Sequence, residues 1–274
     1  MKHGFKINTV HGVTYLSVPA FDETGLAVTC FSTRLGGVSA SPLDTMNLGF
    51  GRGDEKSIVL RNYEILGNAA GFDALRTVAF SQIHRDGVCV ADNSDAGGAF
   101  SACKREYDAV VTNTPNLPIA TYHADCVPVF LLDTKSRAVG VAHAGWRGTA
   151  MKTPAAAIRE MEKSFGSRPQ DILAAVGPAI GACCFETDSD VPDAMLASFG
   201  NDAKKHIVSH NNGKYHVSLP ELNVLTLLTS GIPEENITVS DECTCCKNDL
   251  YWSHRATGGL RGTMAAVIML KGEK

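Results

Sequence analysis

Three side chains that can bind a metal ion stand where apolar runs end in small-residue turns: His84, Cys126 and His143. Zinc binds imidazole nitrogen and thiolate sulfur tetrahedrally, and a catalytic zinc keeps three protein ligands so that water or substrate can take the fourth position. We therefore expect a catalytic metal site on these residues, with Zn²⁺ as the ion and copper as the alternative. Their wide spacing equally allows three ordinary structural side chains.

The same residues also suit covalent catalysis. A thiolate beside an imidazole has a lowered pKa, so Cys126 can serve as a nucleophile with His84 or His143 as its base. Asp125, the acidic neighbour of this cysteine in the chain, is included among the catalytic candidates. A bound metal separates the two hypotheses, because a thiolate that ligates a metal is no longer a free nucleophile.

Two arginines stand beside glycines in runs that favour anion binding. Arg147 follows His143 by four positions inside Gly-Trp-Arg-Gly, and Arg34 lies in Thr-Arg-Leu-Gly-Gly. A guanidinium and the exposed N–H groups of a turn together suit a phosphate, so both arginines are predicted phosphate ligands. Arg147 is also counted among the catalytic residues, and Asn47 is predicted to contact the substrate through its amide. The alternative for Arg147 is a surface ion pair.

The chain has nine cysteines, an odd number that includes the adjacent pairs Cys183-Cys184 and Cys245-Cys246. Such pairs do not form a simple disulfide framework, so reduced thiols are expected. The run from Cys243 to Cys246 contains one spacing of the zinc-knuckle kind, but it occurs once and an adjacent pair is a poor partner for it. We therefore expect small buried thiols here, and not a four-cysteine zinc site.

Composition limits the class of protein. With 274 residues, 44% hydrophobic and 20% charged residues and a net charge of -4, the chain has no basic footprint for nucleic acid or an anionic membrane. It contains no run of about 18 apolar residues and no secretory signal, so a cytoplasmic location is expected. Because no Pro/Ser-rich or charged linker divides the chain, a single domain is predicted over 1–274. The oligomeric state stays open.

Short apolar runs alternate with helical patterns along the chain. The mixture lacks strict strand–helix–strand alternation, which predicts a layered α/β or α+β fold. Strands are predicted over 77–80, 109–112, 129–132, 138–142 and 172–176, and a hairpin over 204–219 around Asn-Asn-Gly. Helices are predicted from a cap at Asp54 through Ala70, from a Thr153-Pro154 start to Gly166, and from Ser218 to Gly231.

Taken together, the motifs resemble one known family, the multicopper polyphenol oxidase or laccase domain family, also called the YfiH family. The resemblance covers roughly residues 25 to 270 and is specific because it is distributed along the chain. The runs that carry it are STRLGGVS at 32–39, NLG at 47–49, QIH at 82–84, ADCVP at 124–128, AHAGWRG at 142–148, GPAIG at 177–181 and the segment 243–255.

The resemblance implies an α/β/β/α sandwich of the cytotoxic necrotising factor type and a zinc site on His84, Cys126 and His143. It also implies phosphorolysis of adenosine, inosine, guanosine and S-methyl-5'-thioadenosine, together with adenosine deamination. Purine nucleosides and phosphate are then the small-molecule partners. Two runs depart from the family pattern, 259–264 in place of the usual Thr-Gly-Arg and 61–62 in place of Asn-Arg, and both are expected at the periphery of the site.

Other activities stay open. A cysteine hydrolase acting on amide bonds, such as those of peptidoglycan, is allowed by the fold kinship and by an editing role within the family. A copper-dependent polyphenol oxidase is suggested by the older family name, but laccase chemistry needs several coppers and many histidines, often as His-x-His, and that pattern does not occur. A non-catalytic metal-binding module is disfavoured by the two glycine-flanked arginines.

Overall fold

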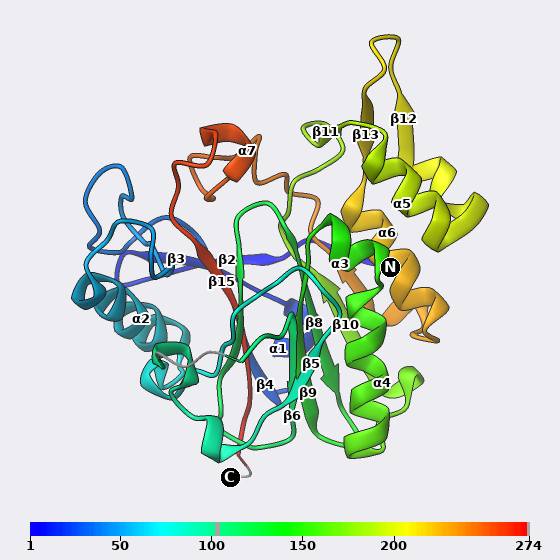
Figure 1. The fold of residues 1–274 in the computed structure, drawn as a ribbon. Coiled ribbons are helices and arrows are strands. Elements are labelled where there is room, and N and C mark those ends of the chain that lie inside the picture. Colours follow the sequence, from blue (N-terminus) through cyan, green and yellow to red (C-terminus); the bar gives the residue numbers. More distant parts are fainter. Residues whose placement is uncertain (102–104, 273–274) are drawn as a thin grey trace.

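Two β-sheets lie face to face in the centre of the molecule, and helices cover the outer side of each (Figure 1). The computed structural model describes residues 1–101 and 105–272. The larger sheet has seven strands, in the order β1 (Lys2–His3), β14 (Ile237–Val239), β10 (Ile172–Val176), β8 (Val127–Asp133), β9 (Ala138–Ala144), β6 (Ala109–Thr112) and β5 (Val88–Val90).

The second large sheet is antiparallel throughout. Its strand order is β2 (Lys6–Val10), β3 (Val13–Ser17), β4 (Ala27–Ser32), β15 (Met264–Leu270) and β7 (Ile119–His123). A third, small sheet has the order β11 (Glu186–Thr187), β13 (Tyr215–Val217) and β12 (Ile207–Ser209). Its strands β12 and β13 form a hairpin that projects from the body of the molecule in Figure 1.

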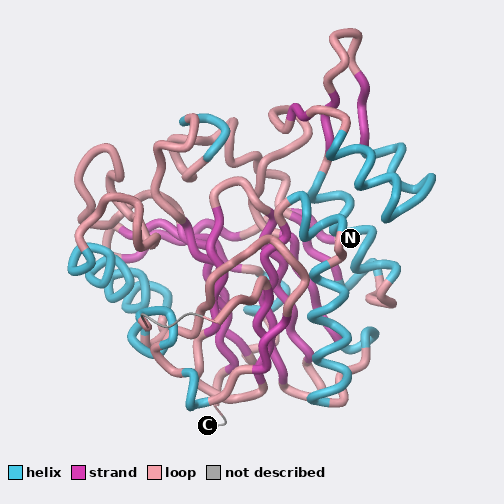
Figure 2. The backbone as a smooth tube through the Cα atoms, viewed as in Figure 1, coloured by secondary structure: helices cyan, strands magenta, loops and turns pink. Residues whose placement is uncertain are grey.

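Figure 2 shows the helices on both sides of the central strands. The α-helices are α1 (Pro19–Asp22), α2 (Lys56–Ala70), α3 (Trp146–Ala150), α4 (Thr153–Phe165), α5 (Asp190–Phe199), α6 (Leu219–Thr229) and α7 (His254–Thr257). Short 3-10 helices cover Ala74–Arg76, Asn93–Asp95, Gly98–Phe100, Pro169–Asp171, Gly200–His206 and Glu234–Asn236. No helix among the described residues combines the length and the apolar character needed to cross a membrane.

Alternation of side chains along β8 explains the layers. Phe130 and Leu132 belong to the core between the two sheets, whereas Val129 and Leu131 belong to the core under the helices α4 and α6. All seven residues of the strand are buried, because both of its faces are covered. The result is a layered α/β/β/α arrangement, as the family resemblance implies.

The outer face of the five-stranded sheet is covered by α2. Its buried residues include Val59, Tyr63 and Leu66, which recur at the helical spacing and share one core with Val267 of β15. The helix ends at Gly71, whose φ of 85° is left-handed, as the predicted stop requires.

Most of the predicted strands are confirmed, and one is wrong. Segments 109–112 and 172–176 match β6 and β10, and the predicted hairpin is present with shorter strands. The segment 77–80 is not a strand, because only Val78 pairs with β7, by an isolated bridge to Ile119, before the chain turns away.

Two predicted helix caps are also wrong. Helix α2 begins after Glu55, and the carboxylate of Asp54 instead accepts hydrogen bonds from Ser39 Oγ at 2.6 Å and Asn47 Nδ2 at 3.2 Å. Helix α4 begins at Thr153 itself, whose hydroxyl donates to carbonyl oxygens and caps no N–H group. In both places tertiary contacts take the side chain that the local pattern assigns to the helix end.

Candidate metal centre and substrate cavity

The side chains of His84, Cys126 and His143 converge, and one ligand atom from each lies within 4.8 Å of the others. Cys126 lies between β7 and β8, where the chain passes from the five-stranded to the seven-stranded sheet. His143 lies near the end of β9, opposite Pro128 of β8. His84 comes from the loop that precedes β5. The fold therefore brings together three residues that are far apart in the sequence.

This donor set fits zinc. One thiolate and two imidazoles are ligands that zinc accepts in a tetrahedral site, and three protein ligands leave one position open. All three side chains line the same cavity, so the open side of the set faces a space that a substrate can enter. A copper ion would accept the same donors, and the ligand types alone do not select between the two metals.

Asp108, which the sequence analysis missed, positions both histidines. Its Oδ1 accepts a hydrogen bond from His143 Nδ1 at 2.8 Å and from the backbone N–H of His84 at 3.0 Å. Its Oδ2 accepts from the N–H groups of Ile83 and Arg85, at 3.2 and 2.8 Å. The carboxylate fixes the tautomer of His143 so that Nε2 is available to a metal, which is the usual arrangement around a zinc-bound histidine.

The backbone at His84 is held in an unusual conformation. Its φ is 60°, which costs a residue with a side chain about 1 kcal/mol or more. The three hydrogen bonds to Asp108 offset this cost, and the next residue, Arg85, has its carbonyl bonded by the hydroxyl of Thr153 at 2.9 Å. The observed strain is therefore maintained by the surrounding structure and aims the imidazole into the site.

The thiol and the imidazole of the centre are strongly coupled. Burial alone would raise the pKa of Cys126, but the charge of His143 and hydrogen bonds from His143 and His84 lower it to about 6. Burial alone would lower the pKa of His143, but the Cys126 thiolate and Asp108 raise it to about 9. The metal-free centre therefore holds a thiolate, which is the form that binds a metal.

A cavity of about 290 Å³ opens beside the three ligands. Two arginines line it, Arg52 and Arg261. Three aromatic side chains form further parts of its wall, Phe50, Phe80 and Tyr122. The cavity thus combines metal ligands, positive charge and flat apolar rings, which are the features of a site for a small ligand that carries a ring and an anionic group.

Arg261 is the second residue that the sequence analysis missed. Burial, together with the charge of Arg52, lowers its pKa to about 10. Its Nη1 donates to Gly262 O and Thr263 Oγ1, but its buried Nε has no hydrogen-bond partner among the described residues. An anion between the two guanidinium groups would relieve both the repulsion and the unsatisfied donor. The run 259–264 was expected at the periphery, and this part of it lies in the cavity.

The two arginines chosen from the sequence lie elsewhere. Arg34 stacks on Trp252 with 3.9 Å between the guanidinium carbon and the ring centroid, and its Nη1 donates to Asn248 O at 2.7 Å. Arg147 is exposed on α3 and stacks on Trp146 at 4.1 Å. Neither lines the cavity beside the metal ligands.

Asn47 and Asp125 support the site from outside the cavity. Asn47 is fully buried, and its Oδ1 accepts from the N–H groups of Gly49 and Thr263, both of which line the cavity. Asp125 has a φ of 85°, and its carboxylate accepts from Thr244 Oγ1 and from the N–H of Arg255, both at 2.7 Å. Asp125 therefore holds the turn that carries the cysteine ligand.

Four cysteines that were expected to be separate buried thiols form a second cluster. The sulfur atoms of Cys183, Cys184, Cys243 and Cys246 all lie within 4.8 Å of one another, and Cys183 and Cys246 are exposed. The expectation is wrong because the adjacent pair and the zinc-knuckle spacing lie on two loops that the fold places side by side.

Fold and centre together define a class: layered α+β proteins with a cysteine and two histidines grouped beside a cavity. A family model described as multi-copper polyphenol oxidoreductase laccase matches residues 28–271, and the chain belongs to this family. Purine nucleoside phosphorylase YfiH of Escherichia coli (strain K12) is 35% identical over 256 residues, which cover 93% of this chain and 98% of that protein. Purine nucleoside phosphorylase YlmD of Bacillus subtilis (strain 168) is 34% identical over 246 residues, covering 88% and 87%.

A solved structure supports the same assignment of fold. The crystal structure of YlmD from Geobacillus stearothermophilus matches this chain with a TM-score of 0.91 at 32% sequence identity. The match covers 98% of this chain and 99% of that one. The arrangement of sheets and helices is therefore shared over nearly the whole chain.

Proposed function

We propose that this protein is a zinc-dependent purine nucleoside phosphorylase acting on adenosine, inosine, guanosine and S-methyl-5'-thioadenosine. The names of the relatives support the phosphorylase class. The observation that carries the proposal is the cavity, which is lined both by the three proposed metal ligands and by Arg52 and Arg261. Such a cavity suits a reaction between a ring-bearing substrate and an inorganic anion.

The side chains divide the work as follows. Arg52 and Arg261 hold the phosphate by charge-assisted hydrogen bonds, and the purine packs against the rings of Phe50, Phe80 or Tyr122. Phosphorolysis then forms a bond between a phosphate oxygen and the anomeric carbon of the ribose. The bond from that carbon to the purine nitrogen breaks, and the base leaves with the electron pair and takes up a proton. Holding both reactants in one small cavity lowers the entropic part of the barrier.

The metal has a defined place in this proposal. His84, Cys126 and His143 would hold the ion, with Asp108 orienting His143 through Nδ1. Zinc bound there would act as a Lewis acid towards an oxygen atom in the cavity. The open side of the ligand set also supports adenosine deamination as a second reaction in the same cavity, which consumes water and releases ammonia.

Product analysis tests the proposal. Purified protein is incubated with adenosine, with and without phosphate, and the products are separated by chromatography. Adenine and ribose 1-phosphate formed only with phosphate support phosphorolysis, and inosine formed without phosphate supports deamination. Turnover of neither kind, in protein that contains the metal, contradicts the proposal.

A cysteine hydrolase acting on amide bonds is the second candidate, and one observation favours it. Cys126, His143 and Asp108 stand in the order nucleophile, base and orienting carboxylate, with Nδ1 of the histidine bonded to the carboxylate. Chelator treatment separates the candidates, because it removes phosphorolysis but frees the thiolate for amide hydrolysis. A polyphenol oxidase is less well supported, because only one of the two donor clusters in the described chain contains imidazole.

A further inference from the structure

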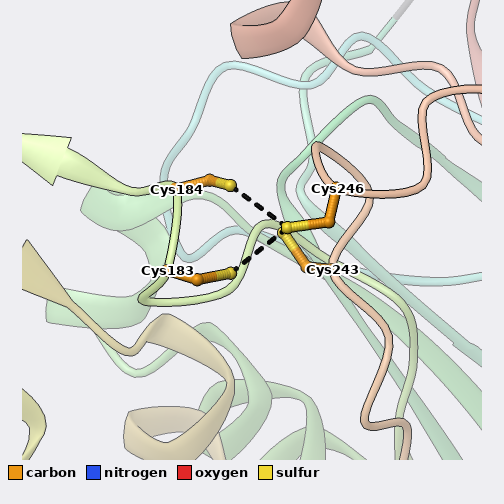
Figure 3. Close-up of side chains that lie close together, drawn as sticks. All are labelled: Cys183, Cys184, Cys243 and Cys246. Atoms are coloured by element: carbon orange, nitrogen blue, oxygen red, sulfur yellow. Dashed lines mark hydrogen bonds between the residues drawn. The ribbon is translucent and has the colours of Figure 1, made fainter.

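We propose that Cys183, Cys184, Cys243 and Cys246 form a second metal site, a closed structural zinc site separate from the cavity. Figure 3 shows these side chains approaching from two loops, with their sulfur atoms turned towards one another. Four thiolates around one ion is the usual composition of a structural zinc site, which leaves no position open for substrate. The segment 243–246 supplies the two-residue spacing that such sites use.

The spacing of the sulfur atoms fits a metal better than a disulfide. Sγ of Cys246 lies 3.5 Å from Sγ of Cys183 and 3.4 Å from Sγ of Cys184. A covalent disulfide would bring two sulfurs to about 2.05 Å. In a tetrahedral site with zinc–sulfur bonds of about 2.3 Å, neighbouring sulfurs stand about 3.8 Å apart. The observed separations of 3.4 and 3.5 Å are close to this value. A single disulfide would pair only two of the four sulfurs, whereas one metal ion would bind all four.

The fold places the two cysteine loops side by side. The two loops follow β10 and β14, which are parallel neighbours, so both loops begin at the same end of the sheet. Between β14 and α7, residues 240–253 contain no helix or strand, and an isolated bridge from Cys243 to Ala179 joins the two loops. Long irregular segments in compact domains are uncommon unless something orders them, and a bound ion can do so.

Polar groups of the neighbouring backbone and of Arg255 contact the two cysteine loops. The N–H of Gly181 donates to Sγ of Cys243 at 3.2 Å. The guanidinium of Arg255 donates to the carbonyl oxygens of Cys184 and Glu186, at 2.8 and 2.9 Å, which holds a positive charge against the loop that carries Cys184. Such contacts around the ligands are typical of metal centres and stabilise bound thiolate.

The proposed site would brace the first centre. Thr244, inside the cysteine run, and Arg255 provide the two hydrogen bonds to the carboxylate of Asp125. Asp125 directly precedes the ligand Cys126 and holds a left-handed backbone conformation. An ordered cysteine loop therefore fixes the turn that presents the catalytic-site thiolate, so the second zinc acts on the cavity by positioning alone.

Metal content of the full chain tests this inference. Zinc per chain is measured by plasma mass spectrometry in wild type, Cys126→Ala, Cys126→Ala/Cys246→Ser and Cys245→Ser. Cys245 is the matched control, because it lies in the same loop and contacts Cys184, but its sulfur is not among the four that group together. We expect Cys126→Ala to keep one zinc, the double variant Cys126→Ala/Cys246→Ser to lose it, and Cys245→Ser to match wild type. Because the Cys126→Ala background reads the second site alone, this result does not depend on the proposed function.

Two outcomes overturn the inference. One is Cys126→Ala protein that contains no zinc, and the other is a thiol titration of denatured protein that shows two sulfurs lost to a disulfide. If Cys246→Ser does not fold, cobalt loaded into Cys126→Ala protein gives the answer instead. Intense sulfur-to-cobalt charge-transfer absorption with tetrahedral ligand-field bands is expected, and a spectrum of octahedral aqueous cobalt contradicts the site.

Discussion

Nδ1 of His143 lies 2.8 Å from Oδ1 of Asp108, and the side chains are 2% and 0% exposed. Burial would raise the pKa of Asp108, but hydrogen bonds from His143 and from the backbone of Arg85 and His84 lower it. The aspartate is therefore a buried anion whose four hydrogen bonds connect the strand that carries His143 to the loop that carries His84. This link determines how both imidazoles face the cavity.

Replacing this carboxylate tests the link. In Asp108→Asn an amide nitrogen can no longer accept the bonds from the 83–85 loop, so we expect metal affinity to fall by about 10-fold to 100-fold. Competition with a chromophoric chelator measures the change. Asp133→Asn is the control, since Asp133 is equally buried and accepts hydrogen bonds from backbone N–H groups. It lies at the end of β8 that is far from Cys126. Equal affinities in Asp108→Asn and wild type would refute the role of the aspartate.

The position of the phosphate is tested by arginine substitutions. Loss of a charge-assisted hydrogen bond costs about 1.5–3 kcal/mol, so Arg261→Ala should raise the KM for phosphate roughly 10-fold to 100-fold. Arg52→Ala should act in the same direction with a smaller effect, because Arg52 is exposed. Arg147→Ala is the matched control outside the cavity. If Arg147→Ala raises this KM and Arg261→Ala does not, the assignment of the anion to the cavity is wrong.

Alkylation of the metal-free protein reports the state of Cys126. The pKa of this thiol is lowered to about 6, so the reactive thiolate is present above that pH and is lost as the pH falls through it. Iodoacetamide labelling of the Cys126 peptide, followed by mass spectrometry, should therefore have its midpoint near pH 6. His143→Asn should move the midpoint towards the ordinary cysteine value of about 8.5. A midpoint above pH 8 in the wild-type protein would show that the histidines do not stabilise the thiolate.

Gly145 leaves room for two of the ligands. A Cβ atom there would lie 3.0 Å from Cδ2 of His84 and 3.1 Å from Sγ of Cys126. Gly145→Ala should therefore displace these ligands by a few tenths of an ångström and weaken metal binding about tenfold, while the fold is retained. Gly98→Ala is the control, because its Cβ would meet only a carbonyl oxygen at 3.9 Å. Calorimetric metal titration of the two variants gives the comparison, and identical affinities would show that the ligands are free to move.

Local patterns in the sequence were sufficient for much of the architecture. The continuous apolar run 129–132 predicts a strand that is buried on both faces. The structure shows this, because every residue of β8 is buried. The helix stop at Gly71 was predictable because a left-handed residue there favours glycine. The starts of α2 and α4 were not, since Asp54 and Thr153 are used by contacts from distant segments.

Within the site, donor chemistry identified the three side chains that the fold brings together but not the groups that orient them. Asp108 stands directly before a buried strand, and only the pairing of β6 with β9 brings it to His143. Arg261 joins the cavity because the segment that leads into β15 forms part of its wall. The four clustered cysteines depend in the same way on parallel pairing of β10 with β14, which no local spacing reveals.

Cys126 lies where the chain passes from one sheet to the other, so a metal ion bound there would stabilise the folded protein. The melting temperature would then report how much of the protein holds the ion. A cation held there is bound by the folded protein and lost on unfolding, so each tenfold excess of free ion over its dissociation constant adds about 1.4 kcal/mol to stability. A melting curve recorded against increasing zinc therefore yields an affinity without any substrate. In cells, chains starved of the ion would be the first to reach the proteases that clear unfolded protein.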